Sequence, residues 1–264
     1  MRKYWELLMV AALAVCAAQG ETIKMMSFNI RMGCGLSDPF QLAEGSLGYL
    51  PQCAEVIKAA APDWVAIQEI DRNTDRAGHV DQTAELARLC GLKGTFVSKV
   101  TKPGGEYGLA LLSKEEPISV SKVLMAGSAH TRAVLIAEFT NYVVACTHFP
   151  LTAENRLNAA RVVKETFANE SKPVFLAGDL NASPSEASIT SLAERFTIWT
   201  DTNTPTFRAD NPTSCIDYIM VDHGHAARVT VKDRQVIAAP EATDHCALTV
   251  TAEVKFPGAV TGGG

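Results

Sequence analysis

The sequence lacks the short motifs that mark several common enzyme classes. It contains no GxSxG, HExxH or Walker glycine pattern, and no CxxC pair or Cys/His cluster that would supply zinc ligands. These absences argue against a serine hydrolase with a nucleophile elbow, a zinc peptidase and a P-loop protein. Internal repeats, low-complexity tracts and Pro/Gly-rich linkers are also missing. One domain is therefore expected over residues 21–256, followed by a disordered tail at residues 257–264.

A long membrane-spanning run is missing as well, although the N-terminus is apolar. Two basic residues precede the apolar run at residues 7–18, and small residues follow it. At about 1.5 Å per residue, a run of this length is too short for a hydrocarbon core of about 30 Å. The pattern predicts a signal peptide at residues 1–20, cleaved before Glu21, and export to the periplasm or the medium. A lipoprotein anchored at Cys16 is less favoured, because Val15 is bulky where such a site has a small residue.

Basic residues are fewer than acidic residues, 24 against 29. The formal net charge is −5, and removal of two basic residues and one acidic residue with the leader lowers it by one, to −6. No lysine-rich arm or ladder of aromatic side chains stands out. A protein that grips duplex nucleic acid usually has a basic face, because neutralising phosphates dominates its affinity. Nucleic acid is therefore an alternative partner that the composition does not favour, although net charge says nothing against a local basic patch.

The chain has seven cysteines, one of them in the leader. An exported protein can form disulfides. Cys146, Cys215 and Cys246 lie within apolar runs, and we expect them to be buried thiols. Cys34 and Cys53 are the first candidates for a disulfide.

Apolar patterning predicts an α/β fold with two groups of strands separated by helices. Four runs at short spacing, residues 107–113, 118–126, 132–139 and 141–149, are expected to form one antiparallel meander. Such strand-rich halves predict two mostly antiparallel sheets packed face to face, with helices outside. The other expected strands are residues 22–30, 63–70, 173–179, 215–221, 227–237 and 245–254, and the expected helices are residues 50–61, 82–90 and 152–169 and one that begins at Pro184.

Polar side chains recur where these apolar runs stop. If the strands are neighbours, their ends converge on one edge of the fold. Each residue also has an ordinary explanation, as a turn, a solvated strand end or a helix cap, but so many coincidences together favour a shared site. An unpaired charge such as Asp217 within a strand is costly to bury and needs a partner. The set is Asn29, Glu69, His148, Asp179, Asn181, Asp217, Asp244 and His245.

The chemistry of this set suits a hard divalent cation. Carboxylate and amide oxygens favour Mg²⁺ or Mn²⁺ over zinc, and a carboxylate beside an imidazole orients the ring. A metal held by few protein oxygens keeps water and takes phosphate oxygens as further ligands. The implied reaction is the attack of water on phosphorus, with charge neutralised by the metal and an imidazole.

Seven motifs in order carry a resemblance to a known family. They are SFNI, QEI, YGLALLS, THF, GDLNASP, CIDYI and TDH, spread from about residue 23 to residue 254. Their order and spacing resemble the endonuclease/exonuclease/phosphatase family, which has the deoxyribonuclease-I-like fold. The resemblance implies a four-layer α/β sandwich and metal-dependent cleavage of phosphate esters. No motif position is missing.

The resemblance also implies roles for the acidic residues. Glu69 matches the principal metal ligand, and Asn29 and Asp244 fall close to the metal. Asp179 matches the residue that orients or deprotonates the attacking water. Asn181 matches the residue that holds the scissile phosphate.

The remaining matches lie on the phosphate side. His245 corresponds to a residue that contacts a phosphoryl oxygen, with Asp217 as its dyad partner, and His148 to a second imidazole. Arg132 and Tyr107 match more weakly as phosphate-facing residues, and a solvated strand end is the alternative for Arg132.

The substrate is the least determined property of the sequence. Residues 69–82 carry Arg72, Arg76 and His79 and form either a loop that shapes the substrate pocket or a solvated loop that caps the next helix through Asp81. Family members cleave nucleic acids, lipids and other phosphodiesters, so the fold does not choose among them. We expect a monomeric phosphodiesterase for a small or lipid-derived ester, with a DNA or RNA nuclease as one alternative and a non-catalytic binding protein as another.

Overall fold

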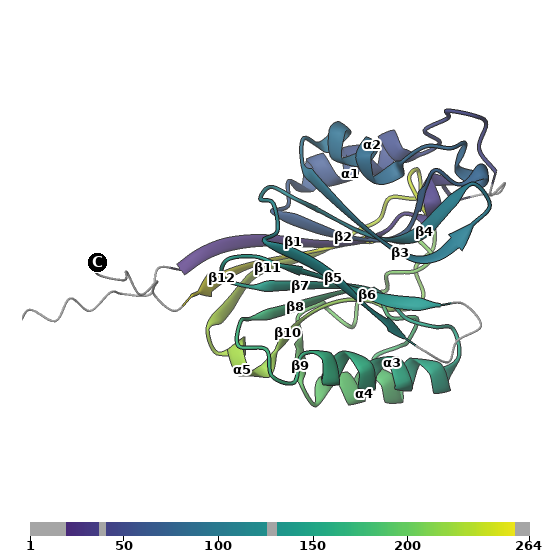
Figure 1. Ribbon diagram of the computed structural model, residues 1–264. Helices are drawn as coiled ribbons and strands as arrows, with labels where there is room; N and C mark the ends of the chain where they lie inside the picture. Colours follow the sequence, from purple (N-terminus) through teal and green to yellow (C-terminus); the bar gives the residue numbers. More distant parts are fainter. Residues whose placement is uncertain (1–19, 37–40, 126–130, 257–264) are drawn as a thin grey trace, which may run out of the picture.

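Two six-stranded β-sheets lie face to face between two layers of helices in the computed structural model of the protein (Figure 1). The strand order is β11-β12-β1-β2-β4-β3 in the first sheet and β5-β6-β7-β8-β10-β9 in the second. The structure describes residues 20–36, 41–125 and 131–256. The expected signal peptide with Cys16, up to residue 19, and the expected tail at residues 257–264 lie outside the described residues.

The elements have the following bounds. The strands are β1 Gly20–Asn29, β2 Trp64–Arg72, β3 Lys93–Lys102, β4 Gly105–Ser113, β5 Ser119–Met125, β6 Arg132–Glu138, β7 Val143–His148, β8 Val174–Asp179, β9 Phe196–Ile198, β10 Asp217–Asp222, β11 Val229–Ile237 and β12 Ala247–Lys255. The helices are α1 Leu50–Ala60, α2 Gln82–Cys90, α3 Ala153–Thr166, α4 Ala187–Ala193 and α5 His223–Ala226, with short 3-10 turns η1 Arg31–Gly33 and η2 Asp75–Ala77.

Three apolar clusters hold the layers together. The largest fills the space between the sheets, where Trp64 of the first sheet meets Phe175 of the second at 6.3 Å between ring centroids. The other two clusters join α1 and α2 to the first sheet and α3 and α4 to the second. Each sheet is antiparallel except for one parallel pair, β1 with β2 and β7 with β8. The predicted four-layer α/β sandwich of two mostly antiparallel sheets is confirmed.

The predicted meander was wrong in its first strand. Residues 107–113 belong to β4, which lies between β2 and β3 in the first sheet, and only β5, β6 and β7 follow one another as a meander. Alternate side chains of β4 enter two cores: Leu109 and Leu111 lie in the cluster between the sheets, whereas Ala110 and Leu112 face the outer helices. Strand β3 was not among the predicted strands, because its lysine-rich sequence has no clear apolar run.

The helix boundaries follow capping chemistry. The Asp81 side chain accepts a hydrogen bond from Ala84 N at the start of α2, and Gly91 ends that helix in the left-handed conformation, as its sequence predicts. The helix expected from Pro184 begins later, at Ala187. Pro184 lies instead in the preceding turn, where the Glu186 carboxylate accepts a hydrogen bond from Ser183 N.

The expected Cys34–Cys53 disulfide does not form. The Cys53 thiol donates to Ala242 O at 3.8 Å, and the Cys34 thiol donates to Met32 O at 3.8 Å. Both cysteines are buried in the first sheet's side of the molecule. Cys146, Cys215 and Cys246 are buried thiols, as predicted.

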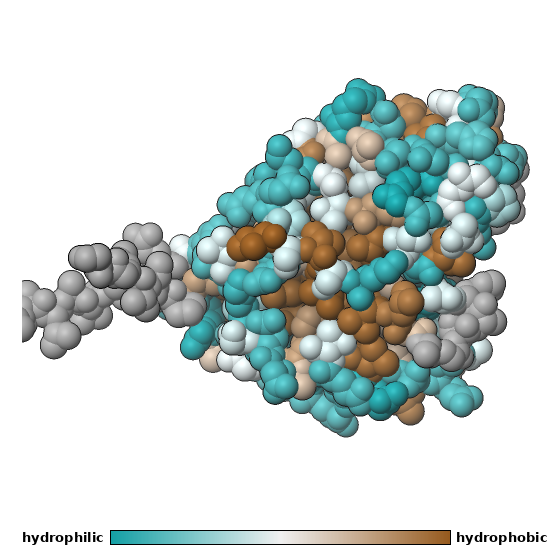
Figure 2. Space-filling view, viewed as in Figure 1, coloured by the Kyte–Doolittle hydropathy of each residue, from teal (hydrophilic) through white to brown (hydrophobic). Residues whose placement is uncertain are grey.

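The outer edge of the second sheet exposes apolar side chains. Figure 2 shows hydrophobic atoms gathered on the face of the molecule over which β5 runs in Figure 1. The exposed large residues here include Ile118, Val120 and Leu124. None of the helices within the described ranges is long and apolar enough to cross a bilayer.

Two β-bulges beside Gly108 shape the end of the first sheet. On β2 the register shifts between Gln68 and Ile70, so that Glu69 is an extra residue, with φ of 54°. On β3 the register shifts between Ser98 and Val100, so that Lys99 is an extra residue. Ile70 and Ser98 both pair with Gly108 of β4. Bulges redirect side chains and are common beside active sites.

We predict that Gly108→Ala destabilises the protein. A Cβ atom at this position would lie 2.1 Å from Val97 O, a contact that forces β3 and β4 apart. The expected loss in the free energy of unfolding is about 1–3 kcal/mol, measured by urea denaturation. Gly224→Ala is the control, because the nearest atom to its Cβ is a side-chain oxygen at 3.3 Å. Equal unfolding midpoints for the two variants would contradict the prediction.

Candidate active site

The predicted polar residues meet at one end of the sandwich. Register explains part of this: His148 of β7 lies opposite Asp179 of β8, and Asp179 lies opposite Asp217 of β10. The first sheet contributes Asn29 and the bulge residue Glu69. A cavity of about 440 Å³ opens here, and its lining includes Glu69, Tyr107, Arg132, His148, Asp179, Asn181, Asp244 and His245.

The amide of Asn29 connects the acids of the two sheets. Its Nδ2 atom donates to Glu69 Oε1 at 3.3 Å and to Asp179 Oδ2 at 3.1 Å, and it lies 3.4 Å from His245 Nε2. Its Oδ1 atom accepts from Arg31 N at 3.0 Å. Asn29 is fully buried at the end of β1. It therefore holds the carboxylates at a short separation from one another.

His245 and Asp217 form a buried ion pair. The Nδ1 atom of His245 lies 3.1 Å from Asp217 Oδ2, which also accepts a hydrogen bond from Thr206 Oγ1 at 2.6 Å. Burial alone would lower the pKa of His245, but the carboxylates of Asp217 and Asp179 raise it above its usual value. The imidazole is thus held in one orientation and in its charged form, with Nε2 directed toward Asp179 at 3.8 Å.

Asp179 and His148 face each other across the parallel strand pair. His148 Nε2 lies 3.4 Å from Asp179 Oδ2 and 3.9 Å from Glu69 Oε1. Burial raises the pKa of Asp179, and burial also lowers the pKa of His148 well below its usual value. Asn181 N donates to Asp179 Oδ1 at 2.9 Å, while the Asn181 side chain donates to Phe149 O. A carboxylate of raised basicity therefore lies next to a neutral imidazole.

The donor set fits a divalent cation bound mainly by oxygen. Ligand atoms of Glu69, His148 and Asp179 lie within 4.8 Å of one another, and so do those of Asp179, Asp217 and His245. The first group suits a metal better, because Asp217 is already engaged by His245 and Thr206. Thiolate ligands are absent from both groups, which favours Mg²⁺ or Mn²⁺.

Asp244 lies at the rim of the cavity, outside both groups of ligand atoms. Its Oδ2 atom is 3.4 Å from Arg31 Nε. Burial raises the pKa of Asp244. The carboxylate is near the predicted metal region, and its ion-pair partner is the Arg31 guanidinium.

Cationic and aromatic side chains also line the cavity. The centroid of the Tyr107 ring lies 4.9 Å from the Arg76 guanidinium carbon and 4.1 Å from Lys99 Nζ. Arg132 is 7% exposed, so the alternative of a solvated strand end is wrong for this residue. Burial lowers the pKa of Lys99 to about 7. Lys99 was not among the predicted site residues, because β3 has no clear apolar run and a bulge leaves no mark in an apolar pattern.

Residues 69–82 combine both of the roles considered for them. Arg76 lines the cavity, and its guanidinium binds Asp71 through two hydrogen bonds of 2.7 and 2.9 Å. Arg72 instead pairs with Glu106 at the side of the sheet. Asp81 caps α2. The segment therefore shapes the pocket through Arg76 and starts a helix through Asp81.

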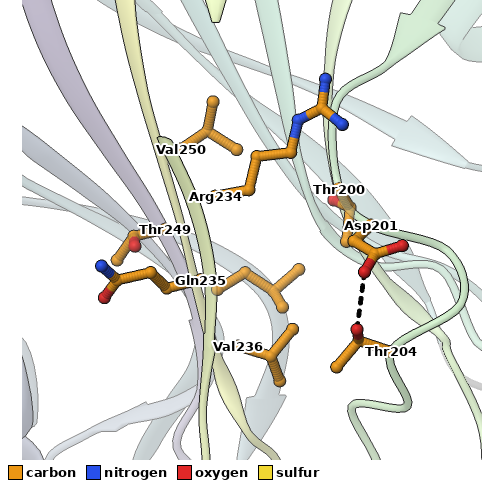
Figure 3. A pocket seen from close by; sticks show the side chains of 9 residues that line it. Thr200, Asp201, Thr204, Arg234, Gln235, Val236, Thr249 and Val250 are labelled. Carbon is orange, nitrogen blue, oxygen red and sulfur yellow. Dashed lines mark hydrogen bonds between the residues drawn. The ribbon is translucent and has the colours of Figure 1, made fainter. Parts of the chain in front are cut away.

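A second cavity lies away from these residues. It measures about 50 Å³ and is lined by β11, β12 and the loop after β9, including Thr200, Asp201 and Arg234 (Figure 3). The Asp201 carboxylate already accepts a hydrogen bond from Thr204 at 2.7 Å, the dashed line in Figure 3. A space of this size is too small for a substrate. The cavity of about 440 Å³ contains the convergent polar residues and is therefore the candidate active site.

Comparison with known proteins identifies the family of this chain. The model of the endonuclease/exonuclease/phosphatase family matches residues 26–245. The chain belongs to this family. The predicted resemblance is thus confirmed, and members of the family are hydrolases that act on phosphate esters.

Solved structures of other family proteins share the fold. An endonuclease/exonuclease/phosphatase from Beutenbergia cavernae is 19% identical, with a TM-score of 0.70 over 88% of this chain and 72% of that one. The mannosyl-6-phosphatase Bt3783 of Bacteroides thetaiotaomicron is 16% identical, with a TM-score of 0.67 over 87% and 99% of the two chains. The human Nocturnin catalytic domain is 18% identical, with a TM-score of 0.63 over 89% and 97%. At these identities the likeness concerns the fold alone.

We predict that Mg²⁺ or Mn²⁺ stabilises this endonuclease/exonuclease/phosphatase protein, because a cation relieves the repulsion between Glu69 and Asp179. At an ion concentration of about 100 times Kd, binding adds about 2.7 kcal/mol, or about 5–10 °C in Tm. Glu69→Gln should lose most of this shift, whereas the exposed control Glu116→Gln should keep it. An unchanged Tm of the wild type with either ion, measured by thermal melting, would refute the prediction.

Proposed function

We propose that the protein is an exported, metal-dependent hydrolase of phosphate esters, and a phosphodiesterase for small or lipid-derived substrates. The observation that carries the proposal is the convergence of Glu69, Asp179 and the His245–Asp217 pair in one cavity. The arrangement supplies an oxygen-rich metal site, a basic carboxylate and a charged imidazole within a few ångströms. These are the groups that attack of water on phosphorus needs.

Glu69 and Asp179 would hold the metal, with Asn29 and Asp244 beside them. When bound, Mg²⁺ or Mn²⁺ supplies positive charge to the phosphate oxygens. Asp179 orients the water and accepts its proton as the water oxygen attacks phosphorus and the ester P–O bond breaks. The Asn181 backbone N–H donates to Asp179 Oδ1 at 2.9 Å and fixes the orientation of this carboxylate toward the cavity.

The imidazoles and the amide bind the phosphoryl group. His245 donates from Nε2 to a phosphoryl oxygen, and Asp217 keeps the ring charged and oriented from the other side. His148 and Asn181 lie on the same cavity wall and contact other phosphoryl oxygens. Charge that develops on the phosphoryl group in the transition state is thereby stabilised.

Cavity size and charge favour a small substrate over duplex DNA. The cavity of about 440 Å³ is in the range of small-ligand sites, and the mature chain has a net charge of −6 after removal of residues 1–20 from a chain of −5. Several basic side chains line this cavity, which favours a negatively charged ligand of matching size. They are Arg76, Lys99, Lys102 and Arg132. A nuclease of the same family is the alternative, and a non-catalytic binding protein is the alternative of another class.

A panel of substrates tests the proposal. The mature protein is incubated with bis-p-nitrophenyl phosphate, p-nitrophenyl phosphate, sphingomyelin and plasmid DNA, each with Mg²⁺ and each with EDTA. We expect hydrolysis of at least one small or lipid ester, loss of activity in EDTA, and its return with Mg²⁺ or Mn²⁺. Full activity in EDTA would disprove the metal role. Rapid nicking of plasmid at about 0.15 M salt would make the nuclease alternative the better one.

The His245–Asp217 pair gives a prediction that depends on its geometry. His245→Ala is expected to lower kcat by about 10²-fold or more, as for other groups that stabilise transition-state charge. Asp217→Asn should lower kcat as well, and the double variant should be little worse than His245→Ala, because the two residues act as one unit.

Thermal melting of each variant controls for folding, since Asp217 begins a buried strand. Losses that simply multiply would rule out the pair, and wild-type kcat in both single variants would rule out both catalytic roles.

Export and a monomeric state complete the proposal. Two basic residues, an apolar run and small residues at positions 1–20 support cleavage before Glu21. N-terminal sequencing of the exported protein should begin near this residue. Recovery of the protein with Met1 intact from the cytoplasm would count against export.

A further inference from the structure

Lys99 places an amine inside the protein without a hydrogen-bond acceptor. The side chain is 5% exposed, and its Nζ atom has no hydrogen-bond partner within the described ranges. It rests on the ring face of Tyr107 at 4.1 Å. An aromatic face replaces only part of the hydration that a buried ammonium loses, so such a group normally has an anionic partner. Lys99 therefore needs an anion that the described residues do not supply.

A β-bulge places Lys99 in the cavity lining. Lys99 is the extra residue of the β3 bulge, just as Glu69 is the extra residue of the β2 bulge, and both bulges adjoin Gly108 of β4. Lys99 and Glu69 line the same cavity. Two register shifts in neighbouring strands therefore direct two charged residues into one cavity. We interpret Lys99 as a functional part of the pocket, because bulges are common beside active sites.

Two other buried nitrogen atoms of the cavity lining also have no hydrogen-bond partner among the described residues. They are Arg132 Nε and His148 Nδ1. Burial and the nearby Arg132 lower the pKa of Lys99. Two cations held together away from water repel each other, and a bound anion removes that repulsion. The wall is therefore arranged for an anion with more than one charge.

We propose that Lys99, together with Arg132, is a binding site for a terminal phosphate group of the substrate. Such a group carries up to two negative charges at neutral pH and three strong acceptor oxygens, which matches two cations and their free donors. A diester with no other phosphate carries one charge and leaves one cation uncompensated.

The proposal rests on the proposed hydrolysis of phosphate esters and narrows the substrate class to esters with a terminal phosphate. In a monoester the terminal phosphate is the group that is cleaved, and the enzyme is then a monoesterase in place of the proposed phosphodiesterase. In a diester the terminal phosphate is a second phosphate beside the cleaved bond.

Binding of inorganic phosphate tests the site without any turnover. Lys99→Met keeps the length and the contact with Tyr107 but removes the charge. Lys93→Met is the control, because Lys93 is exposed on the same strand and lies outside the cavity lining. Isothermal titration calorimetry is done with saturating Mg²⁺ at about pH 7, above the second phosphate pKa of about 6. Lys99→Met should weaken phosphate binding by about tenfold or more, the size expected for a lost charge-assisted hydrogen bond, and Lys93→Met should leave it unchanged.

Equal affinity of the wild type and Lys99→Met would overturn the proposal, and so would a wild type that binds no phosphate. If Lys99→Met does not fold, Lys99→Gln takes its place. The result does not depend on catalysis. A wild type that hydrolyses nothing but binds phosphate through Lys99 would refute the proposed function and leave this site standing.

Two matched pairs of substrates then locate the terminal phosphate. The first pair is p-nitrophenyl phosphate and bis-p-nitrophenyl phosphate. The second is the p-nitrophenyl ester of thymidine 5′-phosphate, with and without a 3′-phosphate. Lys99→Met should lower kcat/KM by about tenfold for the member with a terminal phosphate in at least one pair, while the other member stays within about twofold. A loss in the first pair means that the terminal group is the one cleaved, and a loss in the second means that it lies beside the cleaved bond. An equal loss on all four substrates would overturn the preference for a terminal phosphate.

Discussion

The hydrogen bonds of the Asn29 amide hold the active site together. This fully buried side chain donates at once to Glu69 of the first sheet and to Asp179 of the second, so it bridges the two halves of the sandwich where their strands end. Two carboxylates brought this close would repel each other strongly in a medium of low polarity. A shared amide reduces that repulsion without neutralising either acid, and it leaves both acids able to bind a cation.

The other charged residues of the site show a balance between the cost of burying a charge and its chemical use. Buried charges destabilise a protein unless they are paired, yet the same burial shifts their proton affinities toward useful values. Asp217, which also accepts a hydrogen bond from Thr206, satisfies the charge of His245 within the protein. Lys99 and Arg132 keep donor atoms that have no hydrogen-bond partner among the described residues. The charges of the His245–Asp217 pair are thus compensated within the protein. The charges of Lys99 and Arg132 remain available to a bound anion.

Sequence patterns predicted most of the residues that converge at the candidate site and part of the fold. Asn29, His148 and Asp179 each stand at the end of a strand, and strand ends are visible as abrupt changes from apolar to polar residues. Glu69 was expected at a strand end but is a bulge residue within β2. The assignment of residues 107–113 to a meander failed, because the partner of a strand depends on which core its two faces enter. Leu109 and Leu111 pack between the sheets whether the neighbour is the next strand or an earlier one.

The sequence by itself determined the family, the sandwich of two sheets and the identity of the acids and imidazoles that converge. Hydrophobic periodicity and the order of the motifs can be read from the sequence without knowing which distant residues are in contact. Tertiary structure alone decided that Asn29 would bridge Glu69 and Asp179, that Cys34 and Cys53 would form no disulfide, and that Lys99 would enter the cavity. The Asn29 bridge depends on contact between two sheets, and the two cysteines depend on how α1 and the loop after β1 pack. Lys99 depends on a bulge between β3 and β4, since one extra residue is enough to turn a side chain from one face of a sheet to the other.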